Sequence, residues 1–221
     1  MKLNPFRMQF DSVLRMLKDY QLELESQLTR MQKDEASRID AFLKTIEDPD
    51  EQYAEETVIG EEYHFTYEVM FPRSQRYSFV VLLFLNLENL LTQFSDGIKR
   101  RDGHLIRAND IRGDIVARSK MYLHKMAKIP DLSQGTWDNI DDLSKVRNCI
   151  VHTLGEVKLS SDQRRIQDIA AQEVGLSIGD SGLHEGFIVL EPAYCEKAVK
   201  DVSLLINELF NKAGFSPSIE R

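Results

Sequence analysis

Glycine, proline and cysteine are scarce in this chain of 221 residues, with 11, 6 and 2 of them respectively. So few glycines and prolines do not supply the many turns of a β-sandwich or barrel, and this favours helices. Cys149 and Cys195 form no C-x-x-C pair, which argues against structural zinc. We therefore expect a helical protein with free thiols, no metal and no cofactor.

Long hydrophobic runs are also lacking. The longest nearly apolar run, "FVVLLFLNLENLL" (79–91), is shorter than the roughly 20 residues of a membrane span and contains two asparagines and a glutamate. The first twelve residues, "MKLNPFRMQFDS", lack the apolar core of a signal peptide. We expect a soluble cytoplasmic protein that does not use a membrane.

Positive charge is in deficit, because the formal net charge is −8. A protein that coats nucleic acid non-specifically would be basic, so this class is disfavoured. The densest basic segment is "KRRDGHLIR" (99–107), for which we favour a solvated loop over a nucleic-acid contact. Signatures of hydrolases, Walker-type NTPases and zinc proteases are missing, and His104, His124 and His184 stand alone in the sequence.

Helical periodicity is the dominant pattern. Residues 10–48 carry apolar residues mostly three or four apart, which predicts one long helix or two, from Phe10–Ser12 to a stop at Pro49. Such a helix suits a core or a dimer interface. Further helices are predicted at 73–99, 109–127, 136–154, 161–173 and 191–213. In the helix predicted at 136–154, Trp137 is expected to pack in the core and Asp138 to be an acid of the first turn.

Two segments indicate strands. "YHFTYEVMF" (63–71) alternates aromatic or β-branched residues with polar ones, and "GFIVL" (186–190) follows the turn-rich 177–185. The acidic segment 51–60 is predicted to be a surface connection between the long helix and the first strand. The predicted fold class is all-α, a helical bundle with a long N-terminal helix and possibly a minor two-stranded ribbon.

The most informative stretch is "DDLSKVRNCIVHTLGEV" (141–157), in the helix predicted to end before Gly155. At about 100° per residue, Arg147 falls in the middle of an apolar stripe. That stripe consists of Ile140, Leu143, Ile150, Val151 and Leu154. A polar stripe runs beside it and consists of Asp141, Ser144, Asn148 and His152.

A guanidinium in an apolar stripe needs a carboxylate, a phosphate or a wet cleft, because burying an unpaired charge is costly. A long side chain also escapes by reaching outward to water. Glu88 is the only acid in the apolar run 79–91, so we hypothesise that it faces Arg147. From the residues alone, a structural ion pair and an anion-binding site carry equal weight.

The segment "RNCIVH" resembles the R-x(4–6)-H motif of HEPN domains, with Asn148 in the position after the arginine that is often polar. The resemblance covers about residues 75–213. It implies an HEPN-like helical domain over 71–221, with residues 1–70 as an elaboration. HEPN proteins are α-helical and usually dimeric, and many are metal-independent endoribonucleases that act as toxins, abortive-infection proteins or CRISPR-associated nucleases.

On this resemblance, Arg147 and His152 would be catalytic together with Asn148, and Glu88 and Ser144 would be supporting residues. The implied substrate is RNA, whose own 2′-OH attacks the phosphate. Histidine exchanges protons near neutral pH, and arginine matches phosphate oxygens with a fork of donors. The acidic chain suggests selective engagement of an RNA loop or tRNA.

One departure from the family pattern concerns regulation. Some HEPN toxins carry H-x-Y, which receives a nucleotide, but here the residues are His152, Thr153 and Leu154, so such regulation is not supported. The alternative hypothesis is a non-catalytic HEPN-like dimer that binds a nucleotide or a partner protein. Its long N-terminal helix suits assembly with another chain, such as an antitoxin or a regulatory protein.

Overall fold

Helices make up almost the whole of the computed structural model, which describes residues 5–215. The chain is 77% helical with one small antiparallel sheet, so the predicted all-α class is confirmed. The α-helices are α1 (Pro5–Leu43), α2 (Pro49–Tyr63), α3 (Phe71–Asp102), α4 (Ile115–Met121), α5 (Thr136–Thr153), α6 (Gln163–Gln172) and α7 (Pro192–Lys212). The strands are β1 (Leu176–Ile178) and β2 (Ile188–Leu190). Two π-helices are η1 (His64–Met70) and η3 (Tyr122–Met126), and three 3₁₀ turns are η2 (Ala108–Asp110), η4 (Val157–Leu159) and η5 (Gly182–His184).

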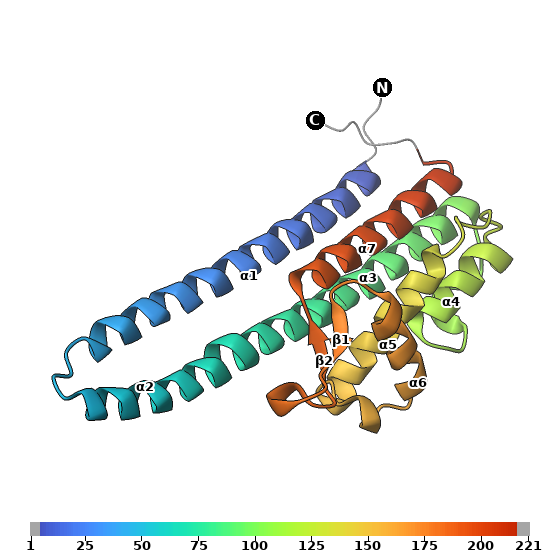
Figure 1. The fold of residues 1–221 in the computed structure, drawn as a ribbon. Helices are drawn as coiled ribbons and strands as arrows, with labels where there is room; N and C mark the ends of the chain where they lie inside the picture. Colours follow the sequence, from blue (N-terminus) through green and yellow to red (C-terminus); the bar gives the residue numbers. More distant parts are fainter. Residues whose placement is uncertain (1–4, 216–221) are drawn as a thin grey trace.

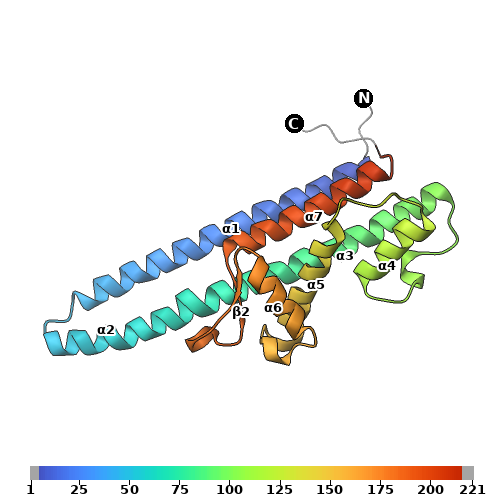
Figure 2. The same cartoon turned by 45° about the vertical axis from the view of Figure 1, so that its right-hand side comes forward.

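Two long helical rods set the shape of the molecule. One is α1, and the other is the continuous run of α2, η1 and α3, which spans the 54 residues Pro49–Asp102. The rods run antiparallel because the short turn 44–48 connects them, and α7 lies along both (Figures 1 and 2). Helix α5 packs on α3 and α7 and carries α6 on its other side.

The second rod contains the one stretch, within residues 5–215, that is long and apolar enough to cross a membrane. Half of that stretch is buried inside the protein. Its buried residues include Val80, Leu83 and Leu87, none of which is more than 1% exposed. These apolar side chains are therefore already used in the core.

The core is continuous from α1 to α7. At the end where α1 begins, Phe10, Phe94 and Phe210 meet with ring centroids 5.0–6.4 Å apart. Gly97 of α3 lets Phe6 approach, because a Cβ there would lie 2.7 Å from the Phe6 ring. The first half of α1 therefore shares the core of the bundle, and the domain boundary at residue 70 stays a prediction.

The strand predicted at 63–71 is wrong, because this segment is the π-helix η1 within the second rod. Its alternation contains a period of four: Tyr63 stacks on Tyr67 with centroids 5.4 Å apart, and Tyr67 meets Phe71 edge-on at 5.3 Å. Side chains four apart meet along a helix, so the same residues satisfy a helical rod.

The surface connection predicted at 51–60 is also wrong, since these residues form most of α2. Asp48 caps the helix through Asp50 N–H, and Pro49 occupies its first turn. The predicted N-terminal helix is one uninterrupted helix that begins at Pro5, before Phe10, and ends at Leu43.

The remaining helices appear close to their predicted positions. The exception is 109–127, where regular α-helix begins only at Ile115 and continues as η3. The apolar stripe of α7 is buried as predicted, and Trp137 packs in the core at the start of α5. The strand at 186–190 exists as β2, but it pairs with β1, with Ser177 opposite Val189, and not with 63–71.

Candidate functional site

Helix α5 carries the arginine–histidine motif and ends in a defined way. Leu154 and Gly155 both have positive φ, 54° and 87°, and the Gly155 N–H donates to the Cys149 carbonyl. A Cβ on Gly155 would lie 2.2 Å from the Tyr77 hydroxyl of α3. That hydroxyl donates to the Ile188 carbonyl of β2. Glycine at 155 therefore fixes the end of the motif helix against both α3 and the ribbon.

Arg147 lies against α3 without a counter-charge. Its guanidinium carbon is 5.2 Å from the centroid of the Phe84 ring, and one terminal nitrogen donates to Asn148 Oδ1 at 2.9 Å. Its Nε is buried and has no hydrogen-bond partner, and within residues 5–215 no carboxylate forms an ion pair with it. A cation left partly buried in this way keeps an unmet demand for an anion or for water.

The ion pair that we hypothesised between Glu88 and Arg147 does not form. Glu88 lies one helical turn beyond Phe84 on α3 and is partly buried, yet the arginine stacks on the ring and turns its donor toward Asn148. The sequence left two interpretations of Arg147 open, a structural ion pair and an anion-binding site. The structural ion pair is now disfavoured. The anion-binding reading remains.

The helical wheel placed Arg147 too deep. The most deeply buried residues between 144 and 149 are Val146 and Cys149, at 0% and 1% exposure. Val151 is 44% exposed and Leu154 is 77% exposed, although both belong to the predicted buried stripe. Arg147 therefore lies at the edge where the buried face of α5 meets the surface.

The other predicted site residues divide between surface and core. His152 is exposed, and the oxygen of Asn148 accepts a bond from Arg147. Ser144 is buried at 7% exposure, so its place in the predicted polar stripe does not bring it to the surface. The structure thus brings Arg147 and Asn148 together at the seam with α3 and leaves His152 on the outer face, about 140° further around the helix.

Exposed apolar side chains flank this seam on both helices. Arg147 meets Phe84 while Gly155 meets Tyr77, so α5 runs antiparallel to α3. On α3, Leu85 follows Phe84 in sequence and is 49% exposed, and on α5 Val151 and Leu154 follow Arg147 by one and two turns and are 44% and 77% exposed. A partly buried cation within an exposed apolar surface is typical of an interface that contains a polar site.

A second polar cluster lies where α3 meets the loop before β2. Arg73 donates to His184 Nδ1 at 3.1 Å and covers the Phe187 ring at 4.8 Å. A cavity of about 90 Å³ opens beside it, and Glu68 and Arg76 also line this cavity. Sequence reasoning missed this pair because 111 positions separate its members. The available signal was a histidine within a turn-rich segment.

Burial lowers the pKa of His184, and the nearby guanidinium of Arg73 lowers it further. The geometry agrees, because Nδ1 accepts the bond from Arg73 and so carries no proton. We interpret the contact between Arg73 and His184 as one that holds α3 against the two-stranded ribbon, and we call it the latch. Among residues 5–215, no group of three or more His, Cys, Asp or Glu side chains is placed to hold a metal ion.

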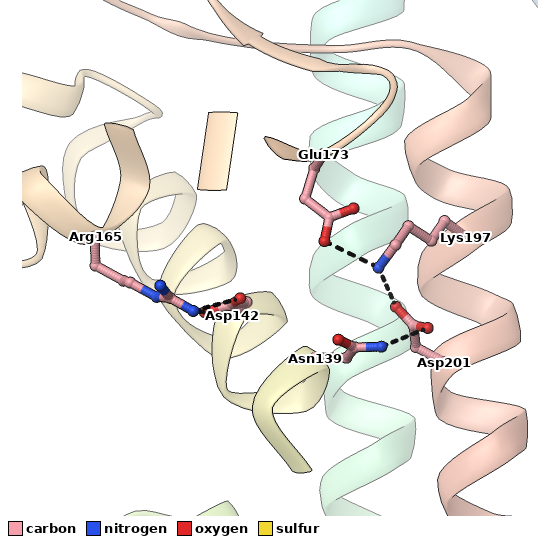
Figure 3. A network of polar contacts seen from close by, with 6 residues as sticks. All are labelled: Asn139, Asp142, Arg165, Glu173, Lys197 and Asp201. Carbon is pink, nitrogen blue, oxygen red and sulfur yellow. Dashed lines mark hydrogen bonds and ion pairs between the residues drawn. The ribbon is translucent and has the colours of Figure 1, made fainter. Parts of the chain in front are cut away.

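A third network ties α5 and the end of α6 to α7 (Figure 3). Lys197 lies between Glu173, at 3.1 Å, and Asp201, at 2.7 Å, and Asn139 donates to the same aspartate at 3.1 Å. The cavity among these residues has a volume of only about 10 Å³, which is at the lower limit for a single water molecule. Beside it Arg165 grips Asp142 with two bonds of 2.7 Å. We interpret this network as structural.

The network of Lys197 predicts a stability effect with a matched control. Lys197→Met leaves Glu173 and Asp201 close together without their shared cation, so we expect a loss of about 1–2 kcal/mol in the free energy of unfolding. Lys200→Met on the same helix removes a cation that is 78% exposed and 4.0 Å from Glu196, and should change stability by less than about 0.5 kcal/mol. Urea denaturation measures both, and equal effects would contradict the structural role.

The latch at His184 predicts an acid-sensitive stability. Its pKa is lower in the folded than in the unfolded chain, so the unfolded state takes up the proton first as pH falls below about 6.5. His184→Gln should therefore lose less stability than the wild type between pH 7.5 and 5.5. The exposed His152→Gln is the control and should keep the wild-type pH dependence. Urea denaturation at both pH values measures this, and identical pH dependence in all three proteins would refute the latch.

Comparison of the chain with protein-family models, with curated proteins and with solved structures gives no match. The assignment of function therefore depends on the geometry at Arg147 and on the resemblance of its motif.

Proposed function

We propose that this protein is a metal-independent endoribonuclease of HEPN type, which cleaves RNA by attack of the 2′-OH and acts in defence or as a toxin. The observation that carries the proposal is the environment of Arg147. This arginine is partly buried and oriented by Phe84 and Asn148, and it has no carboxylate partner within residues 5–215. An arginine that served only the fold would be paired with a carboxylate or would extend into water.

The chemistry of the motif supports this activity. A guanidinium held by an aromatic ring keeps its remaining donors in a fixed fork, which suits two oxygens of one phosphate. Asn148 fixes the orientation of that fork through its 2.9 Å bond. His152 is exposed on the outer face of the same helix, where a histidine can exchange protons with RNA. In the proposed reaction the 2′-oxygen bonds to phosphorus, the bond from phosphorus to the 5′-oxygen breaks, and a 2′,3′-cyclic phosphate forms.

The negative charge of the chain is concentrated in one segment. Residues 47–62 contain eight acidic residues and no basic one, which equals the whole formal net charge of −8. This segment is α2 and the turn before it, at the far tip of the hairpin from α5 (Figure 1). The remaining residues sum to zero, but residues 136–191, which include α5, contain ten acids and five bases, so RNA has to reach Arg147 selectively.

The exposed apolar seam supports the dimer that the resemblance implies. A second copy of the chain, related by two-fold symmetry, would cover Leu85, Val151 and Leu154 and bring two Arg147–His152 motifs to one cleft. Burying this surface offsets the cost of holding the arginine there. The same dimer is compatible with the alternative function, in which the site binds a nucleotide or a partner protein without cleaving it.

The direct test is cleavage of total cellular RNA by the purified protein in EDTA. We expect cleavage that yields 2′,3′-cyclic phosphate ends and spares an oligonucleotide with 2′-deoxy sugars. His152→Ala should lower the rate at least about 100-fold. Arg147→Ala should lower it by a similar factor because the phosphate loses its charged donors. His64→Ala, which changes another exposed histidine on the second rod, is the control and should cleave normally.

Three results would overturn the nuclease proposal. The first is full activity in His152→Ala, and the second is cleavage abolished by EDTA. The third is the absence of cleavage by folded wild-type protein that still binds RNA or nucleotides, which would establish the alternative function.

A further inference from the structure

A groove lies in the outer part of the hairpin, between the end of α1 and the second rod. It has a volume of about 630 Å³ and is enclosed by residues 35–42 on one side and 59–67 on the other. Its apolar and aromatic lining residues are Ile39, Ala41, Phe42, Ile59, Tyr63 and Tyr67. It is larger than the cavities beside Arg73 and Lys197, and the proposed nuclease function does not use it.

The groove is open because the two helices hardly pack on each other here. Helix α2 buries none of its 15 residues, and the buried residues of α1 end at Leu28. Helices in proteins are stabilised mainly by packing of an apolar face, and this part of the hairpin has little such packing. The outer hairpin, which consists of α2 and the second half of α1, therefore leaves apolar surface without a packing partner.

Two hydrogen bonds at the π-helix connect the two rods at the base of the groove. The Gln32 side chain donates to the Tyr67 carbonyl at 2.8 Å, and the Tyr63 hydroxyl donates to the Gln32 carbonyl at 3.1 Å. The π-helical turn and its stacked tyrosines make one wall of the groove where it joins the body of the protein. At the other end the turn 44–48 connects the helices. The groove thus has a fixed frame with an unfilled centre.

The walls expose large apolar side chains to solvent. Phe42 is 48% exposed inside the groove. Val58 and Tyr53 lie on α2 outside the groove and are 63% and 74% exposed. Such a surface indicates an interaction site in a folded protein.

The charge around the groove indicates which kind of partner would bind there. Glu35 and Glu62 lie in its lining, and the segment 47–62 beside it holds eight acids and no base. The only basic residue of the lining is Arg38, which already pairs with Glu35 at 2.7 Å. RNA and a second acidic hairpin would be repelled from this site. A cationic partner would be attracted.

We propose that this groove binds a basic amphipathic helix of a partner protein. The groove lies lengthwise between two helices, which suits a third helix that places its apolar face on Phe42, Ile59 and Tyr63. Lysines and arginines on the flanks of that helix would face the acids of α2. The complex would complete a three-helix arm. The site is separate from α5, so the proposal stands whether or not the protein cleaves RNA.

The test uses an 18-residue peptide with leucines at helical spacing and lysines elsewhere, labelled for fluorescence anisotropy. We expect it to bind the full-length protein, and the same peptide with glutamates in place of lysines not to bind. Phe42→Ala/Ile59→Ala should weaken binding at least tenfold, because it removes the apolar floor. The control, Tyr53→Ala/Val58→Ala, removes apolar groups that lie outside the groove and are more exposed, and should bind within twofold of the wild type. Circular dichroism checks that all variants are folded.

Other outcomes would overturn the proposal. Absence of binding of the lysine peptide would do so, as would equal affinity in all variants, which indicates general attraction to an acidic tip. A wild-type dimer that becomes monomeric in Phe42→Ala/Ile59→Ala would assign the groove to a second copy. Displacement of the peptide by RNA would assign it to nucleic acid.

Discussion

The fold depends on the need to cover α3 along most of its circumference. Twelve of its residues are buried, and α1, α4, α5 and α7 each pack on part of its surface. Phe84 lies at the edge of this cover, where α5 crosses, and its ring receives the guanidinium of Arg147. The packing therefore positions the arginine: α5 cannot bury Val146 and Cys149 against the core without placing Arg147 on that ring. Tyr77 and Gly155, two turns along α3, fix the same helix at its end.

The structure separates two surfaces of different character. The surface at α5 presents Arg147, which has no carboxylate partner within residues 5–215, beside the Phe84 ring of α3. The outer hairpin is strongly acidic and presents an open apolar groove with a frame held by Gln32 and Tyr63. One chain therefore carries two separate sites. We propose that the site at Arg147 binds an anion and that the groove between α1 and α2 binds a cationic partner. Binding at the groove would leave the seam at Arg147 accessible.

Sequence alone predicted the helices well where their apolar residues recur with the helical period, as in α1, α5 and α7. It failed at residues 63–71, because apolar residues that alternate also recur every four positions. Such a sequence suits a strand or a helix, and only the packing decides between the two. It placed Arg147 too centrally, since a wheel treats all apolar residues as equal, whereas Val151 and Leu154 are exposed at 44% and 77%. The pairing of Arg73 with His184 and the groove between α1 and α2 are tertiary features that local patterns do not encode. The role of Glu88 was misjudged for the same reason.

In the proposed function, Arg147 is held for an external anion and not for the stability of the fold. The most direct measurement is the free energy of unfolding of Arg147→Met, which keeps an apolar stem over Phe84 and removes the charge and the unpaired Nε. The account predicts stability equal to or greater than that of the wild type, because no ion pair is lost. A loss of about 3 kcal/mol or more would show that the arginine has a buried structural partner and would contradict the account.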